Sequence, residues 1–352
     1  MNESRNISTQ VLSHARELVM RYGWNTMAYQ ILNPGISLWF SQQHEAVVGY
    51  VQTRTHCIVA GSPVAAKNDM EGVVLEFYQH ISAQKKKVCF FGAQERIATI
   101  LANHAPISSI LLGAQPVWSP QGWLDTLHTK SSLRAQVQRA NNKSVSAELW
   151  DPISVPKAEL YRCLNEWIAS RRLPPMHFLV EPDTLNRLED RIVIIARRNG
   201  RVTGFCIASP IPLRNGWLIE QIVRGNDAPN GTAELLLETM VLHLRSLNAE
   251  IITLGLSPLS QQYSSSFEQP MWLKSLLQII RYYGRSFYNF KGLDAFKSKF
   301  HPAEWEPVYA ITNEIRPTPS TLYAIATAFS GMSPVRFFAK GVTKMITRKY
   351  SN

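Results

Sequence analysis

The sequence predicts an α/β fold in which mixed, mostly antiparallel sheets are flanked by helices. Residues 191–224 contain three apolar, β-rich runs separated by Arg-Asn-Gly at 198–200 and again at 214–216. Asn-Gly supplies the positive φ angles that a tight hairpin needs, so this stretch is expected to form an antiparallel meander. A helical pattern follows at once, because Thr232 can cap a helix whose apolar side chains share one face as far as Leu247.

The elements after this helix complete a recognisable order. Residues 250–260 form one buried strand that ends in a small-residue turn, and Pro270 suits the first turn of a helix with an apolar face at Trp272, Leu273, Leu276 and Ile279. Meander, helix, strand, helix is the order of the N-acetyltransferase-like fold, whose acyl-donor site lies where the central strands splay. Its phosphate-binding turn corresponds to residues 224–233, where backbone N–H groups around Asn230 and Gly231 would hold a phosphate. The alternative is that this turn merely connects two elements.

The first 120 residues repeat the same order more loosely, with strands expected at 36–40, 45–53, 55–65 and 86–93 and helices at 69–83 and 94–104. We therefore predict two tandem acetyltransferase-like domains and a tail. The predicted limits are residues 1–129 for a degenerate N-terminal domain, 130–315 for a catalytic domain, and 316–352 for a basic amphipathic helical tail.

Charge and composition narrow the classes of partner. The net charge is +11 and the pI is near 9.5, so the protein attracts polyanions such as nucleic acid or anionic lipid headgroups. Four widely spaced cysteines predict free, buried thiols in a reducing compartment, and the histidines show no metal-ligand spacing. The first ten residues lack the apolar core of a signal peptide, and no run of 18 apolar residues occurs. We expect a cytoplasmic protein without a metal.

Five segments carry a resemblance to a known family: SLRAQVQRANNK, LPPMHFLVEP, IVRGNDAPNG, LGLSPLS and above all YNFKGLDAFKSKFHPAEWEPVYA, which ends at Ala310. They resemble the cytosolic domain of the aminoacyl-phosphatidylglycerol synthases, also called phosphatidylglycerol lysyltransferases or multiple peptide resistance factors. The resemblance implies two acetyltransferase-like domains, an aminoacyl-tRNA donor and transfer of the aminoacyl group to a lipid hydroxyl. It also implies that no cofactor is used, because the acetyl-coenzyme A function has been lost.

The candidate site residues follow from this resemblance and from two departures. The acidic residue that often begins the family's Asp-Leu-Met-Arg motif is Gln221 here, which leaves Glu220 as the nearest carboxylate. The family's Pro-x-Trp-x-Pro-x-Tyr stretch is interrupted by an insertion and ends at Tyr309. We expect Glu220 or His177 to act as general base and Arg224 to neutralise charge. Each of them has a structural alternative: a surface carboxylate, a loop histidine or a plain salt bridge.

Lys297 and Lys299 lie two positions apart, so they share a face if the segment is extended and diverge if it is helical. We interpret them as a grip on a phosphate of the tRNA acceptor end or of the lipid, with solvated lysines as the alternative. Ser257 and Tyr309, in two of the matching segments, complete the predicted substrate-binding set.

Two helices are predicted to contact the macromolecular partners. Residues 131–143 form a basic helix, on which Lys130, Arg134, Arg139 and Lys143 are expected to follow an RNA backbone, or else simply to keep the protein soluble.

A second basic helix begins at Ser333 and Pro334, where cations recur every four residues opposite apolar side chains. Such a helix suits an anionic membrane surface, although it can equally pack on the domain. Its predicted membrane-contacting residues are Arg336, Phe338, Lys340, Lys344 and Arg348.

Three hypotheses remain from the sequence. The first is an aminoacyltransferase that moves an amino acid from aminoacyl-tRNA to phosphatidylglycerol or a related lipid, docked on the inner face of the cell membrane. The second is a coenzyme A-dependent N-acyltransferase acting on a small amine or peptide. The third is a non-catalytic module that binds RNA or membrane. The sequence specifies neither the amino acid, nor the acceptor, nor the oligomeric state.

Overall fold

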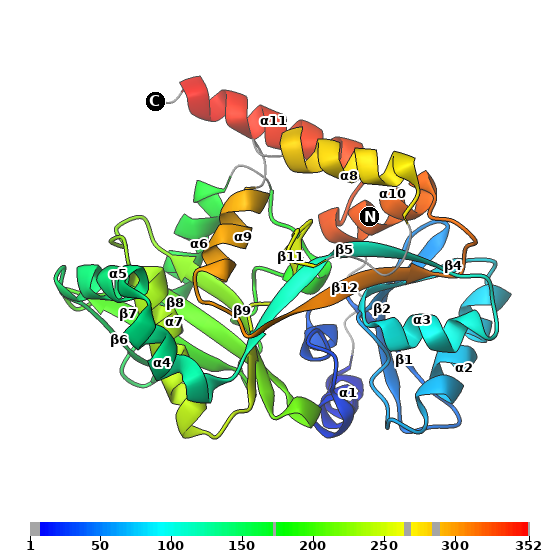
Figure 1. Ribbon diagram of the computed structural model, residues 1–352, viewed down its shortest axis with the longest axis horizontal. Helices are drawn as coiled ribbons and strands as arrows, with labels where there is room; N and C mark the ends of the chain where they lie inside the picture. The colour runs from blue at the N-terminus through cyan, green and yellow to red at the C-terminus, as the bar shows by residue number, and fades with distance from the viewer. Residues whose placement is uncertain (1–7, 172–173, 264–268, 284–288, 351–352) are drawn as a thin grey trace.

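The computed structural model describes residues 8–171, 174–263, 269–283 and 289–350. Within these residues, twelve strands form one sheet in the order β1-β2-β3-β4-β12-β5-β10-β9-β8-β7-β6, and β11 pairs with β5 beside this path. Figure 1 shows the sheet running through the whole molecule, with β5 and β12 crossing between two halves.

The C-terminal half contains the predicted meander. Its strands are β6 (Val145–Leu149), β7 (Ile192–Arg198), β8 (Arg201–Ile211), β9 (Gly216–Arg224) and β10 (Ile251–Thr253). β6 to β9 pair antiparallel, whereas β10 pairs parallel to β9. Asn199 and Gly200 have φ angles of 51° and 80°, and Asn215 has 43°. The first Asn-Gly turn therefore has both positive φ angles expected of it, whereas in the second only the asparagine is left-handed.

The N-terminal half repeats these pairing directions. β1 (Ser37–Phe40), β2 (Val47–Gln52) and β3 (His56–Ala60) pair antiparallel, and β4 (Lys87–Ala93) pairs parallel to β3. Because both halves show an antiparallel series followed by a parallel pair, the predicted α/β fold with two acetyltransferase-like halves is confirmed.

Two central strands are exchanged between the halves. β5 (Ser108–Trp118) follows the N-terminal half in sequence but pairs with β10 of the C-terminal half. β12 (Glu304–Thr312) follows the C-terminal half but pairs with β4. β5 and β12 also pair with each other, from Glu304 opposite Val117 to Thr312 opposite Ser108. One continuous sheet results, and the predicted domain limits stay a prediction.

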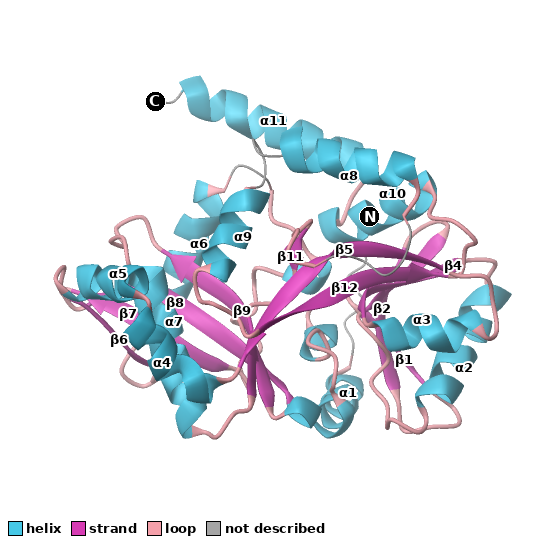
Figure 2. Ribbon diagram, viewed as in Figure 1, coloured by secondary structure: helices cyan, strands magenta, loops and turns pink. Residues whose placement is uncertain are grey.

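Helices cover both faces of the sheet (Figure 2). In the C-terminal half, α6 packs over Val193 and Ile195, while α5 and α7 pack over Ile194 and Ala196, because neighbouring strand residues point to opposite faces. The helices have the following bounds: α1 Thr9–Tyr22, α2 Met70–Ala83, α3 Glu95–Ala102, α4 Trp123–Thr129, α5 Ser131–Asn141, α6 Lys157–Ser170, α7 Thr232–Ser246, α8 Met271–Tyr283, α9 Phe290–Ser298, α10 Pro319–Ser330 and α11 Pro334–Tyr350.

Shorter elements lie between these helices and strands. They are the 3-10 helices η1 Tyr29–Leu32, η2 Pro120–Gly122, η3 Phe178–Val180 and η4 Pro212–Arg214, and the two-residue strand β11 Ser257–Pro258.

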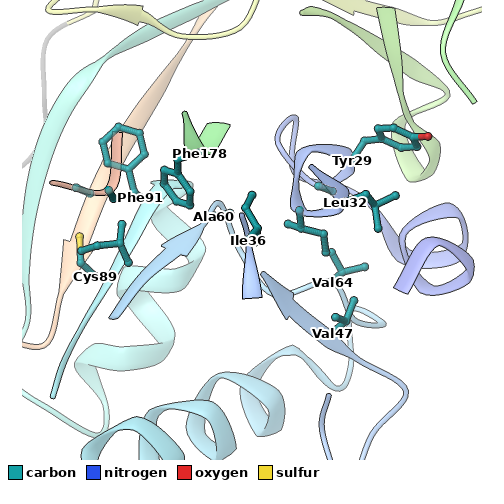
Figure 3. Close-up of a cluster of buried hydrophobic side chains, with 14 of the residues drawn as sticks. Tyr29, Leu32, Ile36, Val47, Ala60, Val64, Cys89, Phe91 and Phe178 are labelled. Atoms are coloured by element: carbon teal, nitrogen blue, oxygen red, sulfur yellow. The ribbon is translucent and has the colours of Figure 1, made fainter. Parts of the chain in front are cut away.

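A core cluster of buried apolar side chains lies between the halves. Figure 3 shows Tyr29 and Leu32 of η1 in the same cluster as Phe91 of β4 and Phe178 of η3. The Phe91 and Phe178 ring centroids lie 6.4 Å apart in an edge-to-face arrangement, a geometry that aromatic pairs favour. Segments from both halves therefore share one core.

Four sequence-based expectations differ from the structure. The N-cap of α7 is Gly231, at φ 98°, and the Thr232 hydroxyl donates to the Pro229 carbonyl instead of capping. The strand expected at 250–260 breaks after Thr253, because Gly255 takes φ 67° and the chain turns to β11. The face of α8 expected to be buried is only partly so, since Trp272 and Ile279 are exposed. The segment around Lys297 is helical rather than extended.

Two further observations concern the thiols and the membrane. All four cysteines are free and buried, as the sequence predicts. Within the described part of the chain, every helix is too short or too polar to cross a bilayer.

Candidate functional site

In the C-terminal half, the parallel strands β9 and β10 pair over only a short length. β10 registers only with Gly216, Trp217 and Leu218, so β9 continues to Arg224 without β10 beside it. A bulge interrupts β9 at Glu220, because Ile207 and Ala208 of β8 face Gln221 and Ile219 and skip the residue between them. Bulges re-aim side chains and are common beside active sites. The sequence analysis predicts the acyl-donor site at such a splay, so this place is the candidate site.

A buried ammonium fixes the chain at the splay. Lys297 of α9 donates from Nζ to the carbonyl oxygens of Leu254, Gly255 and Leu256, each at 2.8 Å. Burial lowers the pKa of Lys297 to about 7, and Asp294 opposes that shift. All three ammonium hydrogens are used by backbone carbonyls of the segment that follows β10. Lys297 therefore fixes the chain where it leaves β9.

Ser257 and Asp294 complete this cluster. Ser257 is fully buried in β11, and its hydroxyl donates to Asp294 Oδ1 at 2.9 Å. Asp294 lies one helical turn before Lys297, so α9 presents a carboxylate and an ammonium on the same face. The sequence analysis named Ser257 and Lys297 but missed Asp294, although its i, i+3 spacing from Lys297 on a helix would have revealed it.

The two lysines of the predicted grip diverge. Lys299 follows α9 and pairs with Glu234 of α7, with 2.5 Å between Nζ and Oε1, whereas Lys297 points into the protein. The interpretation of a shared phosphate-binding face is wrong as geometry, because α9 is a helix and separates positions two apart. In this structure both ammonium groups have partners within the protein.

Glu220 belongs to a buried ion pair. Arg191 Nε and Nη2 donate to its two carboxylate oxygens at 2.8 and 3.2 Å, and Nη2 also donates to Asn33 Oδ1 at 2.9 Å. Burial alone would lower the pKa of Arg191, but Glu220 outweighs burial and raises it. Arg191, which the sequence analysis missed, links the bulge of β9 to the segment that follows η1.

His177 is connected to the bulge through one loop. Its Nδ1 lies 2.9 Å from Glu181 Oε2, and this bond raises the pKa of His177 despite partial burial. Gln221 donates to the carbonyl oxygens of Glu181 and Pro182, both at 2.9 Å. The side chain at the position of the family's acidic residue therefore anchors the loop that carries the histidine's partner. Half of the His177 side chain is exposed.

The turn at 224–233 is occupied by the protein's own groups. The backbone N–H of Asn226 donates to Glu166 Oε2 at 2.9 Å, which lowers the pKa of that carboxyl group. Arg224 donates to the Ala228 carbonyl at 3.1 Å. A Cβ on Gly231 would lie 2.0 Å from the backbone oxygen of Gln136, so this glycine packs against α5. A carboxylate of α6 thus sits where a phosphate would bind, while Asn230 remains exposed.

The remaining predicted residues lie elsewhere. Tyr309 is fully buried among the side chains under α2 and α3 in the N-terminal half, so the structure does not bring it to the splay. Arg134 and Arg139 on α5 are exposed, as is Lys143 just after it, and Lys130 is half-buried before its start. Within α11, Arg336, Phe338 and Lys340 are exposed, whereas the side chains of Lys344 and Arg348 lie outside the described residues.

In the N-terminal half, side chains fill the place that corresponds to the splay of β9 and β10. At the end of β3 and β4, Asn25 donates to the Gly92 carbonyl at 3.0 Å, and a Cβ on Gly92 would lie 2.4 Å from the sulfur of Met27. A Cβ on Gly61 would likewise lie 2.6 Å from Asn25 Oδ1. The segment between α1 and η1 therefore closes this splay.

Comparison with known proteins agrees with the fold and the resemblance. A family model described as phosphatidylglycerol lysyltransferase, C-terminal, matches residues 16–312. The chain is 22% identical over 294 residues to the phosphatidylglycerol lysyltransferase of Bacillus subtilis, which covers 82% of this chain and 33% of that protein. The chain thus spans about a third of the length of the curated relatives it matches.

Two solved structures share the architecture. One is a C-terminal domain (DUF2156) from Agrobacterium fabrum, assigned to a lysylphosphatidylglycerol synthetase, with 23% identity, a TM-score of 0.76 and coverage of 91% of this chain and 96% of that one. The other is L-PGS from Bacillus licheniformis, with 17% identity, a TM-score of 0.73 and 96% coverage of both chains. The family match spans most of the sequence, and the resemblance is confirmed: the chain belongs to the phosphatidylglycerol lysyltransferase C-terminal family.

Proposed function

We propose that this chain is an aminoacyltransferase that moves an aminoacyl group from aminoacyl-tRNA to a hydroxyl of phosphatidylglycerol or a related polar lipid. Family membership supports this proposal, as do the names of the relatives. The observation that carries it is the splay of β9 from β10, where Lys297 fixes the chain and where β9 bulges at Glu220.

The reaction needs positioning more than a protein nucleophile. The acceptor hydroxyl oxygen attacks the ester carbonyl carbon, the bond to the tRNA ribose oxygen breaks, and the acceptor proton ends on the released ribose hydroxyl. Since the ester is already activated, orientation and stabilisation of the developing oxyanion dominate. The cluster of Ser257, Asp294 and Lys297 then serves to keep the backbone at the splay in place.

We assign the general base to His177 rather than Glu220. Both oxygens of Glu220 accept hydrogen bonds from Arg191, so the carboxylate is engaged by the protein itself. Nδ1 of His177 is oriented by Glu181, so Nε2 is available to accept a proton from the acceptor hydroxyl. His177→Gln should lower kcat about 10²-fold, whereas His104→Gln, in an exposed pair with Glu71 at 3.1 Å, should leave it unchanged.

The tRNA would meet the protein along α5. Arg139 on this helix and Lys143 just after it are exposed, while the buried side of the helix is formed by Leu133, Val137 and Ala140. Each phosphate contact on a single strand adds about 0.7 to the salt slope of log affinity. Replacing Arg139 and Lys143 by glutamine should therefore flatten that slope by about 1.4, while Arg54→Gln, at an exposed turn of the N-terminal half, should not.

Membrane docking would use α11 and α8, which run along the upper edge of the view in Figure 1. Pro334, Phe337 and Gly341 face the protein, while Val335 and Phe338 are 71% and 50% exposed beside the exposed cations Arg336 and Lys340. α8 adds a second exposed apolar stripe, which consists of Met271, Trp272, Ile279 and Tyr282. Exposed apolar and aromatic groups beside cations are typical of helices that lie in a membrane interface.

Flotation with anionic vesicles tests this surface. Phe338→Ser should weaken vesicle binding several-fold, about the effect of removing one apolar side chain from an interface. Leu149→Ser on β6 is the matched control, because Leu149 is exposed to a similar extent, 52%. Equal losses in the two variants would contradict docking through α11.

The activity is tested by incubating the protein with each labelled aminoacyl-tRNA and with vesicles that contain phosphatidylglycerol. Label should enter the lipid extract with one amino acid or a few. No labelled lipid with any aminoacyl-tRNA would contradict the proposal. Labelled acyl-coenzyme A serves as the alternative donor, and we expect no transfer from it because Glu166 occupies the phosphate position of the turn.

A further inference from the structure

The residue that follows the proposed base has a strained backbone. Phe178 begins η3 directly after His177, and its φ angle is 65°. A left-handed φ suits glycine and asparagine, but it is strained for a bulky side chain. Such strain persists only where the surrounding contacts over-determine the conformation, and it is concentrated at functional sites. The contacts of Phe178 therefore bear on how His177 works.

Two aromatic side chains from distant segments hold Phe178, which is 3% exposed. Its ring centroid lies 5.3 Å from that of Phe329 on α10, with 81° between the ring planes. The ring centroids of Phe91 and Phe329 lie 4.8 Å apart at 64°, and Phe91 also meets Phe178 edge to face. Each of the three pairs has the edge-to-face geometry that aromatic rings favour. Phe91, Phe178 and Phe329 therefore form a closed aromatic triad.

The end of α10 also contacts His177. The backbone N–H of His177 donates to the Phe329 carbonyl at 2.8 Å. A Cβ on Gly331, where α10 ends, would lie 3.4 Å from Cδ2 of the imidazole, so the helix end lies beside the ring. Nδ1 lies 2.9 Å from Glu181 Oε2. Glu181 is the charged partner of His177 within the described residues, because these contacts from α10 involve a carbonyl oxygen and a glycine.

Core filling alone does not explain this arrangement. A phenylalanine can fill an apolar core with an ordinary negative φ, so burial accounts for the ring but not for the left-handed backbone. We propose that Phe178 is a positioning residue: the triad holds its ring, and the left-handed turn that results directs the His177 imidazole to Glu181. The inference rests on the proposed function in taking His177 as the general base. It adds that β4 and α10, outside the splay, determine where that base lies.

Removing the ring should affect the reaction through His177. In Phe178→Leu the triad is broken, so the backbone at 178 can relax toward a negative φ and the imidazole turns away from Glu181. Misplacing the general base lowers kcat, and we expect a loss of about tenfold. The KM for either substrate should stay the same, because the binding surfaces are unchanged. The hydrogen bond to Glu181 raises the pKa of His177, so its loss should lower that pKa toward the ordinary value.

A matched control exists in the N-terminal half. Phe77 of α2 is fully buried and meets Trp39 and Tyr50 edge to face, with ring centroids 5.2 and 5.6 Å apart. Phe77→Leu removes a comparable set of ring contacts in a different core cluster, so kcat per folded molecule and the pKa of His177 should not change.

Phe329→Leu is a second test of the triad. Phe329 is only partly buried, and the loss of its side chain leaves the carbonyl that binds the His177 N–H in place. This variant should lower kcat and the pKa of His177 in the same direction as Phe178→Leu.

Transfer kinetics and an NMR titration of the histidine ring nitrogens give the two readouts, and the signal of His177 is identified by its absence in His177→Gln. An unchanged pKa of His177 in both triad variants would overturn the inference, as would an equal loss of kcat in Phe77→Leu. A lowered pKa with full kcat would leave the positioning intact and contradict only the proposed role of His177 as base. A loss of activity in His177→Gln, with full kcat and unchanged pKa in both triad variants, would contradict only this inference.

Discussion

The two halves of the molecule pair their strands in the same directions and differ where the parallel pair ends. In the N-terminal half β3 and β4 stay registered over five residue pairs, and the Gly61 N–H extends the ladder to the Phe91 carbonyl. In the C-terminal half β9 and β10 register over three pairs and then part. Asn25 and Met27 pack at the end of the first pair, while a buried ammonium binds the chain just beyond the second pair.

This difference supports the proposal that the C-terminal half holds the reaction site. Closing a splay with an amide and a thioether stabilises the fold, whereas burying an ammonium is a burden on stability unless hydrogen bonds offset it. The C-terminal half buries charged groups in two places, at Lys297 and at the Arg191–Glu220 pair, and hydrogen bonds offset the cost in both. Four substitutions test this difference between the halves, and they follow in order of decreasing expected effect.

The largest effect is expected at Lys297. Lys297→Met leaves three carbonyls without their donor and Asp294 without its neighbouring cation, so the free energy of unfolding should fall by about 4 kcal/mol in urea denaturation. Lys299→Met, which breaks a pair nearer the surface, should cost about 1 kcal/mol. Similar losses in the two variants would mean that Lys297 does not fix the chain at the splay.

The same residue predicts a pH dependence. Its pKa in the folded state, about 7, lies below that of an unfolded lysine. The unfolded state therefore binds more protons between pH 7 and about 10, and stability should rise with pH across this window. In Lys297→Met this rise should disappear, and its persistence would assign it to another group.

The second effect concerns the bulge of β9. Arg191→Met leaves Glu220 buried without its cation and should cost about 3 kcal/mol in the free energy of unfolding. Adding Glu220→Gln to that variant should recover part of the loss, because the unpaired charge is then removed. Additive losses in the double mutant would show that the pair is not coupled.

A smaller effect is expected in the closed half. Asn25→Ala removes donors to the Gly92 carbonyl and to Gln94 Oε1, and it should cost about 1 to 2 kcal/mol. Since this splay is filled, transfer per folded molecule should not change. A fall in kcat at unchanged folded fraction would show that the N-terminal half takes part in the reaction.

The smallest effect is expected at His177, whose pKa Glu181 raises. A raised pKa contributes stability that is present below the unfolded value near 6.5 and is lost as the pH rises through the folded value. His177→Gln should therefore lose up to about 0.5 kcal/mol at pH 5.5 and nothing at pH 8.5, a modest amount because the pair is half exposed. Denaturation at the two pH values measures the difference.

The sequence predicts local structure better than it predicts long-range pairing. The turns at Asn199 and Asn215 can be predicted from the sequence, because a left-handed φ depends on the type of one or two residues. The partners of β5 and β12 are not encoded locally, since Ser108 pairs with Thr312 across two hundred residues. Both strands escaped the sequence analysis for that reason.

The same distinction between local and long-range features applies to the candidate site. Glu220, His177, Ser257 and Lys297 were named from motifs, but what each side chain does depends on partners from distant segments. Arg191 reaches Glu220, and the carbonyl of Gly255 reaches Lys297, only after the sheet has formed. Tyr309 was misplaced because β12 crosses into the other half. A motif identifies such residues without indicating their neighbours.

The exchange of β5 and β12 has a consequence for biosynthesis. β4 is synthesised early, whereas its sheet neighbour β12 begins only at residue 304. Until β12 has been made, one edge of β4 stays unpaired. Unpaired strand edges can pair with other chains, and such long-range pairing slows folding. The first 130 residues expressed alone should accordingly aggregate, and co-expression of the remaining residues should restore their solubility.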